Sequence, residues 1–169
     1  EDMYTISPSA WIIWQIVAAY ISRVPDHKGR LDMPDVPDLT KGFWGTAFAD
    51  IDKEEIYLTQ KYYAFGQFSR YIRPGMTIVN IDKRSVAAYD KETNRLVLVC
   101  VNPKAKDENV SVAFHTFSRS LRKITPIRTS GSIAYGEHWE ELPSFTADGN
   151  EFTYTLQGNS ITTFIIDMP

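Results

Sequence analysis

The feature that most constrains the fold is a series of short β-type segments in the C-terminal half of the chain. After Gly75, runs of β-branched and aromatic residues alternate with turn signals such as DKETN, NPKAKDEN and ADGN. The seven runs are MTIVNID, SVAAYD, RLVLVCVN, VSVAFHT, KITPIRTS, EFTYTLQ and SITTFIID. Short strands at such even spacing are typical of an antiparallel β-sandwich. We therefore predict a β-sandwich domain over residues 75–169.

One of these runs predicts which of its side chains are buried. In EFTYTLQ, Phe152, Tyr154 and Leu156 alternate with Thr153 and Thr155. Successive side chains of a strand point to opposite faces of the sheet. The apolar side chains are therefore expected in the core and the threonines in water.

The residues ahead of the sandwich are too few for a second complete domain. The run AWIIWQIV over Ala10–Val17 is apolar except for one glutamine, which is typical of a strand buried on both faces in a parallel sheet. A segment from residue 22 to 41 carries three of the nine prolines and predicts a long loop. The segments GTAFADI and EIYLT are predicted to form a short hairpin.

A helix is predicted over Thr59–Ile72, in the stretch that ends KYYAFGQFSRYIRPG. Its apolar stripe recurs at spacings of three and four residues. The stripe consists of Leu58, Tyr62, Phe65, Ser69 and Ile72. The helix is expected to end at the Arg-Pro-Gly corner, because proline disfavours helical geometry in the residue before it and glycine is a natural turn residue.

Composition excludes several classes of partner. The formal net charge is -3 and the sequence pI is about 5.6, so the chain has no broad basic surface for nucleic acid. It has no apolar run of eighteen residues or more and no signal-peptide pattern, so no membrane span is predicted. The sequence does not begin with Met, and we expect it to be a segment of a longer protein.

No cofactor or metal site is predicted from the residues. The acidic cluster DIDKEE at 50–55 fails as a calcium loop, because Glu55 stands where a glycine is needed. His27, His115 and His138 lack the spacing of zinc ligands. The acidic cluster is expected to be a solvated turn.

Several blocks together carry a family resemblance. The order SAWIIWQ, FWG, KYYAFGQFSRYIRPG, IRTS and SITTFIID resembles the C-terminal portion of glycoside hydrolase family 30, which includes lysosomal glucosylceramidase and microbial endo-β-1,6-galactanases. The resemblance implies a (β/α)8 barrel flanked by a β-sandwich. Residues 1–74 would then be the last strand, loop and helix of the barrel. The expected fold class is mostly β, with an antiparallel sandwich after this remnant.

The resemblance also implies a mechanism. Family members use two glutamates in a retaining reaction, with carboxyl groups about 5 Å apart. Both glutamates would precede Glu1, so no catalytic residue is assigned within this chain, and the chain alone is expected to be inactive. Sandwich strands that the family supplies from ahead of the barrel would also precede Glu1.

The resemblance places sugar-binding residues at the end of the barrel strand. Trp14 is expected to stack on a sugar beside the scissile bond, and Gln15 to donate or accept a hydrogen bond there. Trp44, in the following loop, is a candidate second stacking ring. The alternative for Trp14 is a purely structural core residue. Glutamine in place of asparagine and the RPG corner favour the endo-β-1,6-galactanase branch.

The expected partner is a β-linked glycan. The apolar strand at 10–17 is expected to be covered by the missing barrel segment of the parent chain or by a second copy. The family implies a location outside the cell, in the periplasm or at the cell surface. An alternative function is a non-catalytic carbohydrate-binding sandwich that uses Tyr135 and Trp139, and a second alternative is a purely structural module.

Overall fold

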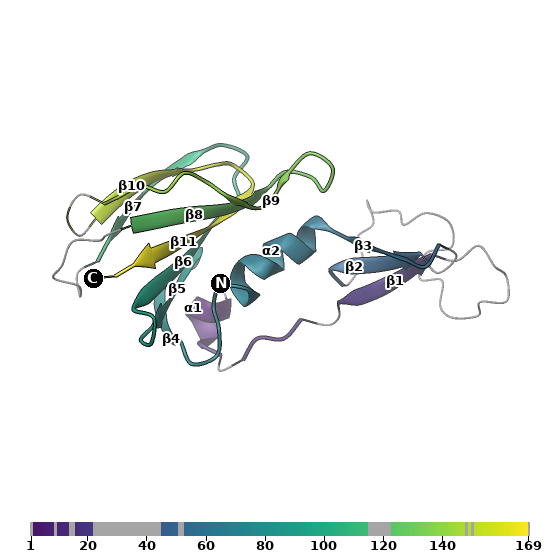
Figure 1. Cartoon of the computed structure of the whole chain (residues 1–169), viewed down its shortest axis with the longest axis horizontal. Helices are drawn as coiled ribbons and strands as arrows, with labels where there is room; N and C mark the ends of the chain where they lie inside the picture. The colour runs from purple at the N-terminus through teal and green to yellow at the C-terminus, as the bar shows by residue number, and fades with distance from the viewer. Residues whose placement is uncertain are drawn as a thin grey trace. The chain divides into compact units, whose positions relative to one another are not determined.

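A computed structural model describes residues 2–8, 10–13, 16–21, 45–50, 53–114, 123–147, 149 and 151–168 (Figure 1). The chain divides into two compact units, one made of Glu1–Ser9 with Ala64–Pro169 and the other of Ala10–Tyr63. The division falls inside a helix, ahead of the domain boundary predicted at residue 75.

The larger unit contains an antiparallel sheet of six strands and a second sheet of two (Figure 1). The six strands lie in the order β4 (Thr77–Asp82), β5 (Ser85–Asp90), β6 (Arg95–Asn102), β11 (Ser160–Asp167), β8 (Lys123–Ser130) and β9 (Glu137–Glu141). The second sheet pairs β10 (Glu151–Leu156) with β7 (Glu108–Ala113). All seven strands predicted after Gly75 are present, and the mostly β fold class with an antiparallel sandwich is confirmed.

One strand of the large sheet was missed by the sequence prediction. β9 has the sequence EHWEE, which lacks the β-branched residues that mark a strand. It forms along β8, where Ile127 pairs with Glu141 and Ser130 with Glu137. Tertiary pairing therefore decides the structure of this edge.

Strands β6 and β11 form the centre of the large sheet and pair antiparallel along their full length. In β6, Leu96, Leu98 and Cys100 belong to the core between the two sheets. Val97 and Val99 point to the opposite face and join a separate apolar cluster. The continuous apolar run in the sequence thus corresponds to a strand covered on both faces.

Aromatic rings fill the space between the two sheets. Phe164 of β11 is fully buried, and its ring centroid lies 5.4 Å from that of Phe152 and 5.0 Å from that of Tyr154. Thr153 and Thr155 are exposed on the other face of β10. The alternation predicted for this strand is confirmed.

The smaller unit contains a three-stranded sheet. β1 (Val17–Ile21) pairs parallel with β2 (Ala47–Asp50), and β2 pairs antiparallel with β3 (Glu55–Leu58). The rings of Phe48 and Tyr57 stack across β2 and β3 with centroids 5.0 Å apart. The predicted hairpin of GTAFADI and EIYLT is confirmed.

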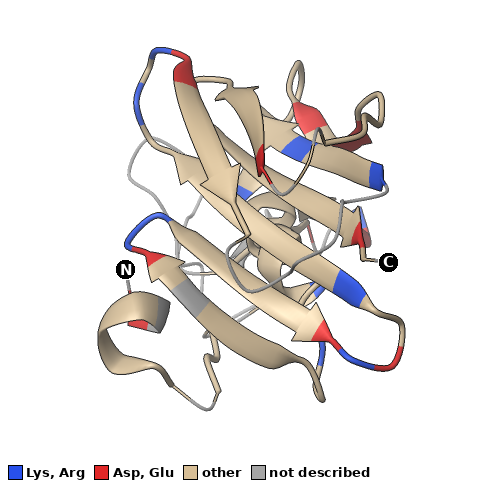
Figure 2. Cartoon of the chain, turned by 90° about the vertical axis from the view of Figure 1, so that its left-hand side faces the viewer, with Lys and Arg blue, Asp and Glu red and all other residues tan. Residues whose placement is uncertain are grey.

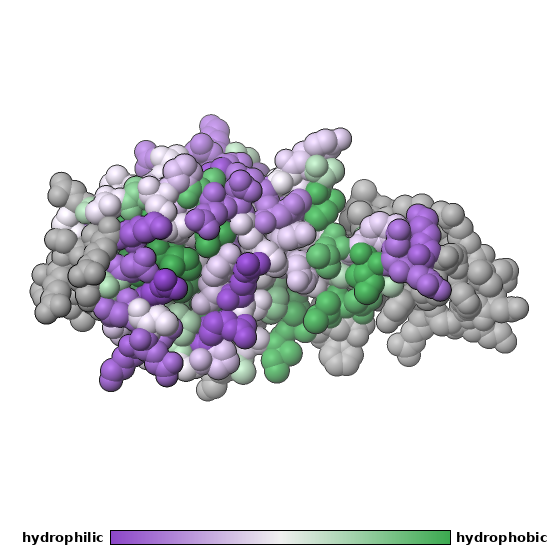
Figure 3. Space-filling model, in the orientation of Figure 1, coloured by the Kyte–Doolittle hydropathy of each residue, from purple (hydrophilic) through white to green (hydrophobic). Residues whose placement is uncertain are grey.

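The strand predicted over Ala10–Val17 is displaced toward the C-terminus. Residues 10–13 have no regular secondary structure, and β1 begins at Val17. Trp11 and Ile12 expose 51% and 88% of their surface, and Figure 3 shows apolar side chains along the segment that leads into β1. A strand buried on both faces needs a covering layer on each side, which the described residues of this unit do not supply. The strand forms instead where β2 offers a parallel partner.

The packing of Phe164 predicts a large effect on stability. Phe164→Ala should lower the free energy of unfolding by about 3–5 kcal/mol, because it leaves a cavity among the aromatic rings. Thr153→Ala, on the exposed face of β10, should change it by less than about 0.5 kcal/mol. Urea unfolding followed by circular dichroism measures both values. Equal changes in the free energy of unfolding for the two substitutions would contradict the placement of Phe164 in the core.

Candidate functional site

Helix α2 (Gln60–Ser69) ends three residues before the predicted end at Ile72, and a turn leads from it to the Arg-Pro-Gly corner. The Arg73 guanidinium donates a hydrogen bond of 2.7 Å from Nη1 to the carbonyl oxygen of Ser69, in the last turn. Gly75 has a φ of +95°, in the left-handed region that favours glycine. The amide of Met76 then donates to the Arg73 carbonyl at 3.2 Å and turns the chain toward β4.

The buried face of α2 differs from the predicted apolar stripe. Gly66 and Gln67 are the buried residues of the helix, whereas Leu58 and Ser69 of the stripe are exposed. Phe68 packs against valines on the outer face of the large sheet. The predicted stripe was wrong for Leu58 and Ser69, whereas Ile72 packs against the same valines. Gly66 and the hydrogen-bonded amide of Gln67 allow the helix to approach the sheet closely.

The side chain of Gln67 joins α2 to two strands. Its Nε2 atom donates to Thr129 Oγ1 at 2.8 Å and to the Ile127 carbonyl oxygen at 3.3 Å, both on β8. The Thr163 hydroxyl of β11 donates to Gln67 Oε1 at 2.6 Å. The fully buried amide therefore has partners at both ends, which offsets the cost of its burial.

Trp139 of β9 covers the same interface. A Cβ atom at position 66 would overlap the Trp139 ring, so only glycine fits there. The Arg70 guanidinium lies 4.7 Å from the Trp139 ring centroid on the helix side. Trp139 has a φ of 60° and its amide donates to Thr129 Oγ1 at 3.3 Å. This tryptophan packs against the helix, whereas Tyr135 is 96% exposed.

The three predicted sugar-binding residues, Trp14, Gln15 and Trp44, lie outside the described residues, and their roles remain predictions. The acidic cluster is described in part. Asp50 ends β2 and is buried, and its Oδ1 atom accepts a hydrogen bond of 3.2 Å from the Lys53 amide. Asp50 therefore closes the turn, and the expectation of a solvated charge is wrong for this residue.

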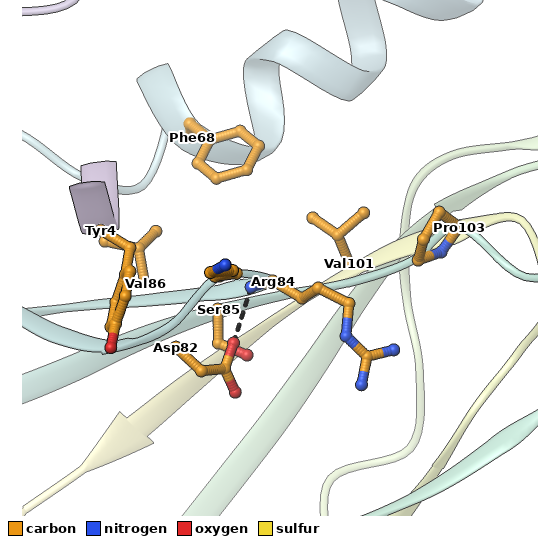
Figure 4. Close-up of a pocket in the computed structure, with 9 residues that line it drawn as sticks. Tyr4, Phe68, Asp82, Arg84, Ser85, Val86, Val101 and Pro103 are labelled. Carbon is orange, nitrogen blue, oxygen red and sulfur yellow. Dashed lines mark hydrogen bonds between the residues drawn. The ribbon is translucent and has the colours of Figure 1, made fainter. Parts of the chain in front are cut away.

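A pocket of about 240 Å³ lies in the larger unit beside the turn between β4 and β5 (Figure 4). Tyr4 of helix α1 (Asp2–Ile6) and Phe68 of α2 contribute aromatic rings to its wall. Val86 and Val101 contribute apolar surface, and residues 82–85 of the turn complete the lining. Sequence analysis missed this pocket because its lining comes from segments that are distant in the chain.

An ion-pair cluster stands next to this turn. Arg84 donates to the two carboxylate oxygens of Glu108 at 2.6 and 3.1 Å, and Lys104 Nζ lies 3.0 Å from Glu108 Oε1. Hydrogen bonds from Arg84 and then Lys104 lower the pKa of Glu108 to about 2. Figure 2 shows that charged residues in this view gather in turns and at strand ends.

The described residues contain neither a metal-binding cluster nor a membrane-spanning helix. Within them, no group of three or more His, Cys, Asp or Glu side chains is placed to hold a metal ion. No helix in the described part of the chain is long and apolar enough to cross a membrane.

The chain is similar to known glycoside hydrolases in sequence and in fold. No family model matches the sequence. Glucuronoxylanase XynC of Bacillus subtilis (strain 168) is 26% identical over 120 residues, which cover 68% of this chain and 27% of that protein. The solved structure of the glycoside hydrolase family 30 subfamily 8 xylanase Xyn30A of Clostridium acetobutylicum matches with a TM-score of 0.57 and 22% identity, over 73% of this chain and 31% of that one.

Other solved structures share the fold. A family 30 endoxylanase of Clostridium papyrosolvens C71 matches with a TM-score of 0.54 and 20% identity, over 72% of this chain and 32% of that chain. These findings confirm the predicted resemblance to the C-terminal portion of family 30 enzymes. The chain spans 27% of the curated relative and about a third of these two structures.

The buried amide of Gln67 generates a prediction about stability. Gln67→Ala should lower the free energy of unfolding by about 2–4 kcal/mol, because it opens a cavity and removes partners of two buried hydroxyl groups. Ser69→Ala, on the exposed side of the same helix, should change it by less than about 0.5 kcal/mol. Urea unfolding measures both. A Gln67→Ala protein as stable as the control would contradict the role assigned to this side chain.

The Glu108 cluster predicts a pH dependence. Because the folded-state pKa of Glu108 is about 2, below the ordinary value of 4.5, its ion pair stabilises the fold at pH above 4.5. That contribution should be lost as the pH falls from 4.5 toward 2. Arg84→Ala should raise the pKa of Glu108 toward 4.5, and Lys104→Ala should raise it less. NMR titration of the Glu108 carboxyl measures these values, and a wild-type pKa near 4.5 would refute the assignment.

Proposed function

We propose that this chain is the C-terminal part of a retaining glycoside hydrolase that acts on a β-linked polysaccharide. The observation that carries the proposal is the sequence match to a glucuronoxylanase along 68% of the chain. The match in fold to two family 30 xylanases over more than 70% of the chain supports it. The proposed site of action is outside the cytoplasm, where polysaccharide is found.

In this proposal the reacting carboxylates belong to the rest of the parent protein. One glutamate attacks the anomeric carbon and forms a glycosyl-enzyme ester, while a second protonates the leaving oxygen and later deprotonates the attacking water. The role of this chain is to supply a sugar-binding wall. Trp14 stacks on the ring beside the scissile bond, Gln15 forms a hydrogen bond to it, and Trp44 adds a second stacking surface.

The sandwich supports the proposal that further segments of the parent chain complete the structure. Val79 and Ile81 of β4 are 45% and 46% exposed. Val79 pairs with Ala87, which belongs to the core between the sheets, so Val79 faces inward. Among the described strands, β7 pairs only with β10. A further strand beside β7 would cover these side chains and use the remaining backbone groups of β7.

The finer substrate is proposed to be β-1,6-galactan or a related β-glycan. Gln15 and the RPG corner favour the galactan. The relatives named above are xylanases, which makes β-xylan the related glycan to compare.

A second candidate function is a non-catalytic carbohydrate-binding sandwich. The observation that favours it is Tyr135, which is 96% exposed in the turn between β8 and β9. Its amide donates to Ser132 Oγ at 3.3 Å, and the close approach of Gly131 and Gly136 shapes the turn. An exposed ring in an ordered turn can stack on the apolar face of a sugar.

The proposed function is tested by hydrolysis assays. The 169-residue chain alone should release no sugar from β-1,6-galactan or glucuronoxylan, because the reacting carboxylates lie elsewhere. A longer protein that carries this chain after a complete barrel should hydrolyse one of them with retention of configuration, measured by NMR of the first product. Turnover by the 169-residue chain, or inversion by the longer protein, would refute the proposal.

A matched pair of substitutions tests the sugar-binding wall. In the longer protein, Trp14→Ala should lower kcat/KM about tenfold to hundredfold, since a stacking ring in the binding site is lost. Trp11→Ala, three residues earlier in the same run, should have a smaller effect. A larger effect of Trp11→Ala would contradict the role of Trp14.

A further inference from the structure

We propose that the Thr59 side chain is a positioning residue for the proposed sugar-binding wall, which it holds through the backbone of Thr46. This inference rests on the proposed function for what the wall binds. The wall residues lie outside the described part of the chain, whereas the contacts that would hold them are described and belong to the smaller unit. These contacts join three segments: residue 16 ahead of β1, residues 46 and 47 at the start of β2, and residue 59 ahead of α2.

The carbonyl oxygen of Ile16 joins the first two segments. The amides of Thr46 and Ala47 donate to it at 2.9 and 2.8 Å, and the Thr46 hydroxyl donates to it at 3.4 Å. The parallel pairing of β1 with β2 begins directly after this point, and Figure 1 shows these two strands beside β3. The start of β1 is therefore fixed to the start of β2.

The carbonyl oxygen of Thr46 joins these strands to helix α2. The Thr59 amide donates to it at 3.1 Å and the Thr59 hydroxyl at 2.7 Å. Thr59 directly precedes α2, and its own carbonyl oxygen accepts a hydrogen bond of 3.0 Å from the Tyr62 amide in the first turn. We call these contacts of Ile16, Thr46, Ala47 and Thr59 the threonine clamp.

Burial makes the threonine clamp hard to rearrange. Thr46 exposes 2% of its surface and Ala47 exposes none. A buried backbone group that loses its partner costs free energy comparable to a lost hydrogen bond. The shortest hydrogen bond of the clamp is the one that the Thr59 hydroxyl donates. It is also a bond that a side-chain substitution removes while the backbone stays intact.

The threonine clamp is next to both parts of the wall in the sequence. Gln15 directly precedes Ile16, and Trp44 stands two residues before Thr46. Consecutive Cα atoms are about 3.8 Å apart, so the Cα atom of Gln15 is about 4 Å from a clamped residue and that of Trp44 at most about 8 Å. Joining Ile16 to Thr46 therefore limits how far the two parts of the wall can separate.

The wall needs such a limit in order to act on a sugar. A stacking ring and a hydrogen-bonding amide bind one sugar together only when their relative position is held. A shift of about 1 Å in a binding group can cost about a hundredfold in rate, so hydrogen bonds behind the binding residues matter for turnover. The Thr59 hydroxyl is assigned this role because it fastens the segment after Trp44 to helix α2.

The first test is the kinetics of hydrolysis by the longer protein with Thr59→Val, which removes the hydroxyl and keeps the side-chain shape. KM should rise about threefold to tenfold, because the wall no longer holds the sugar in position. An enzyme that is only less stable has fewer active molecules, which lowers the apparent kcat and leaves KM unchanged. Thr59→Ser keeps the donor hydroxyl and should return KM to within about twofold of the wild-type value.

A double-mutant cycle shows whether Thr59 acts through the wall. Thr59→Val is combined with Trp14→Ala and, separately, with Trp44→Ala. In at least one background it should raise KM less than it does in the wild type, because residues that act as one unit are not additive. The control Thr155→Val removes a hydroxyl that donates to Asn109 Oδ1 at 2.8 Å on β10, and it should leave KM unchanged.

Amide hydrogen exchange tests the threonine clamp without any activity. In the 169-residue chain, Thr59→Val should speed the exchange of the Thr46 and Ala47 amides about tenfold, because their segment opens more often. The Phe164 amide in β11 should exchange as in the wild type. Circular dichroism establishes that the variants fold.

The proposal is overturned if Thr59→Val leaves KM unchanged, if Thr59→Ser does not restore it, or if KM rises equally in the wild type and both tryptophan backgrounds. A rise in KM with Thr155→Val equal to that with Thr59→Val would also overturn it. Unchanged exchange of the Thr46 and Ala47 amides would refute the clamp even in an active enzyme. Faster exchange, with no hydrolysis by the longer protein, would refute the proposed function and the role of Thr59 in sugar binding, while the clamp itself would stand.

Discussion

The structure depends first on the central antiparallel pairing of β6 with β11. Each strand buries both of its faces, so this pair of strands contributes side chains both to the core between the sheets and to the contact with helix α2. The inner face presents Leu98 and Phe164 to the second sheet, and the outer face presents Val99 and Thr163 to helix α2. A slip of one residue would exchange these faces. The register of this pair therefore determines which side chains form the sandwich core and which side chains contact helix α2.

The helix is fastened to that outer face by polar contacts set among apolar ones. Gln67 satisfies its amide on β8 and β11, and Gly66 allows the ring of Trp139 to lie against the helix. Buried polar groups require a matching partner, so they favour one position of the helix over others that apolar packing alone would permit. In the proposed hydrolase, these contacts would hold the last helix of the barrel against the sandwich. The same contacts explain why Trp139 does not form an exposed sugar platform.

The edges of the two sheets differ in ways that bear on function. At one edge of the large sheet, β9 is rich in acidic residues, and Glu137 forms a two-pronged ion pair of 2.6 Å with Arg128 on β8. At the other edge, β4 carries half-exposed Val79 and Ile81. Charge on an edge strand discourages pairing with another chain, whereas exposed apolar side chains favour it. Further segments of the parent protein are accordingly proposed to pack at β4 and β7.

The sequence by itself determined the elements whose signals are local: the seven strands, the hairpin of β2 and β3, and the presence of α2 ahead of the turn at Pro74 and Gly75. Alternation, β-propensity and the geometry of proline act over a few residues, so they can be read without a partner. Only the tertiary structure decided the strand β9, the start of β1 at Val17, the buried face of α2 and the pocket beside the β4–β5 turn. The partners of Gln67 lie 60 to 96 residues away in the chain, and no short-range pattern encodes contacts at that separation.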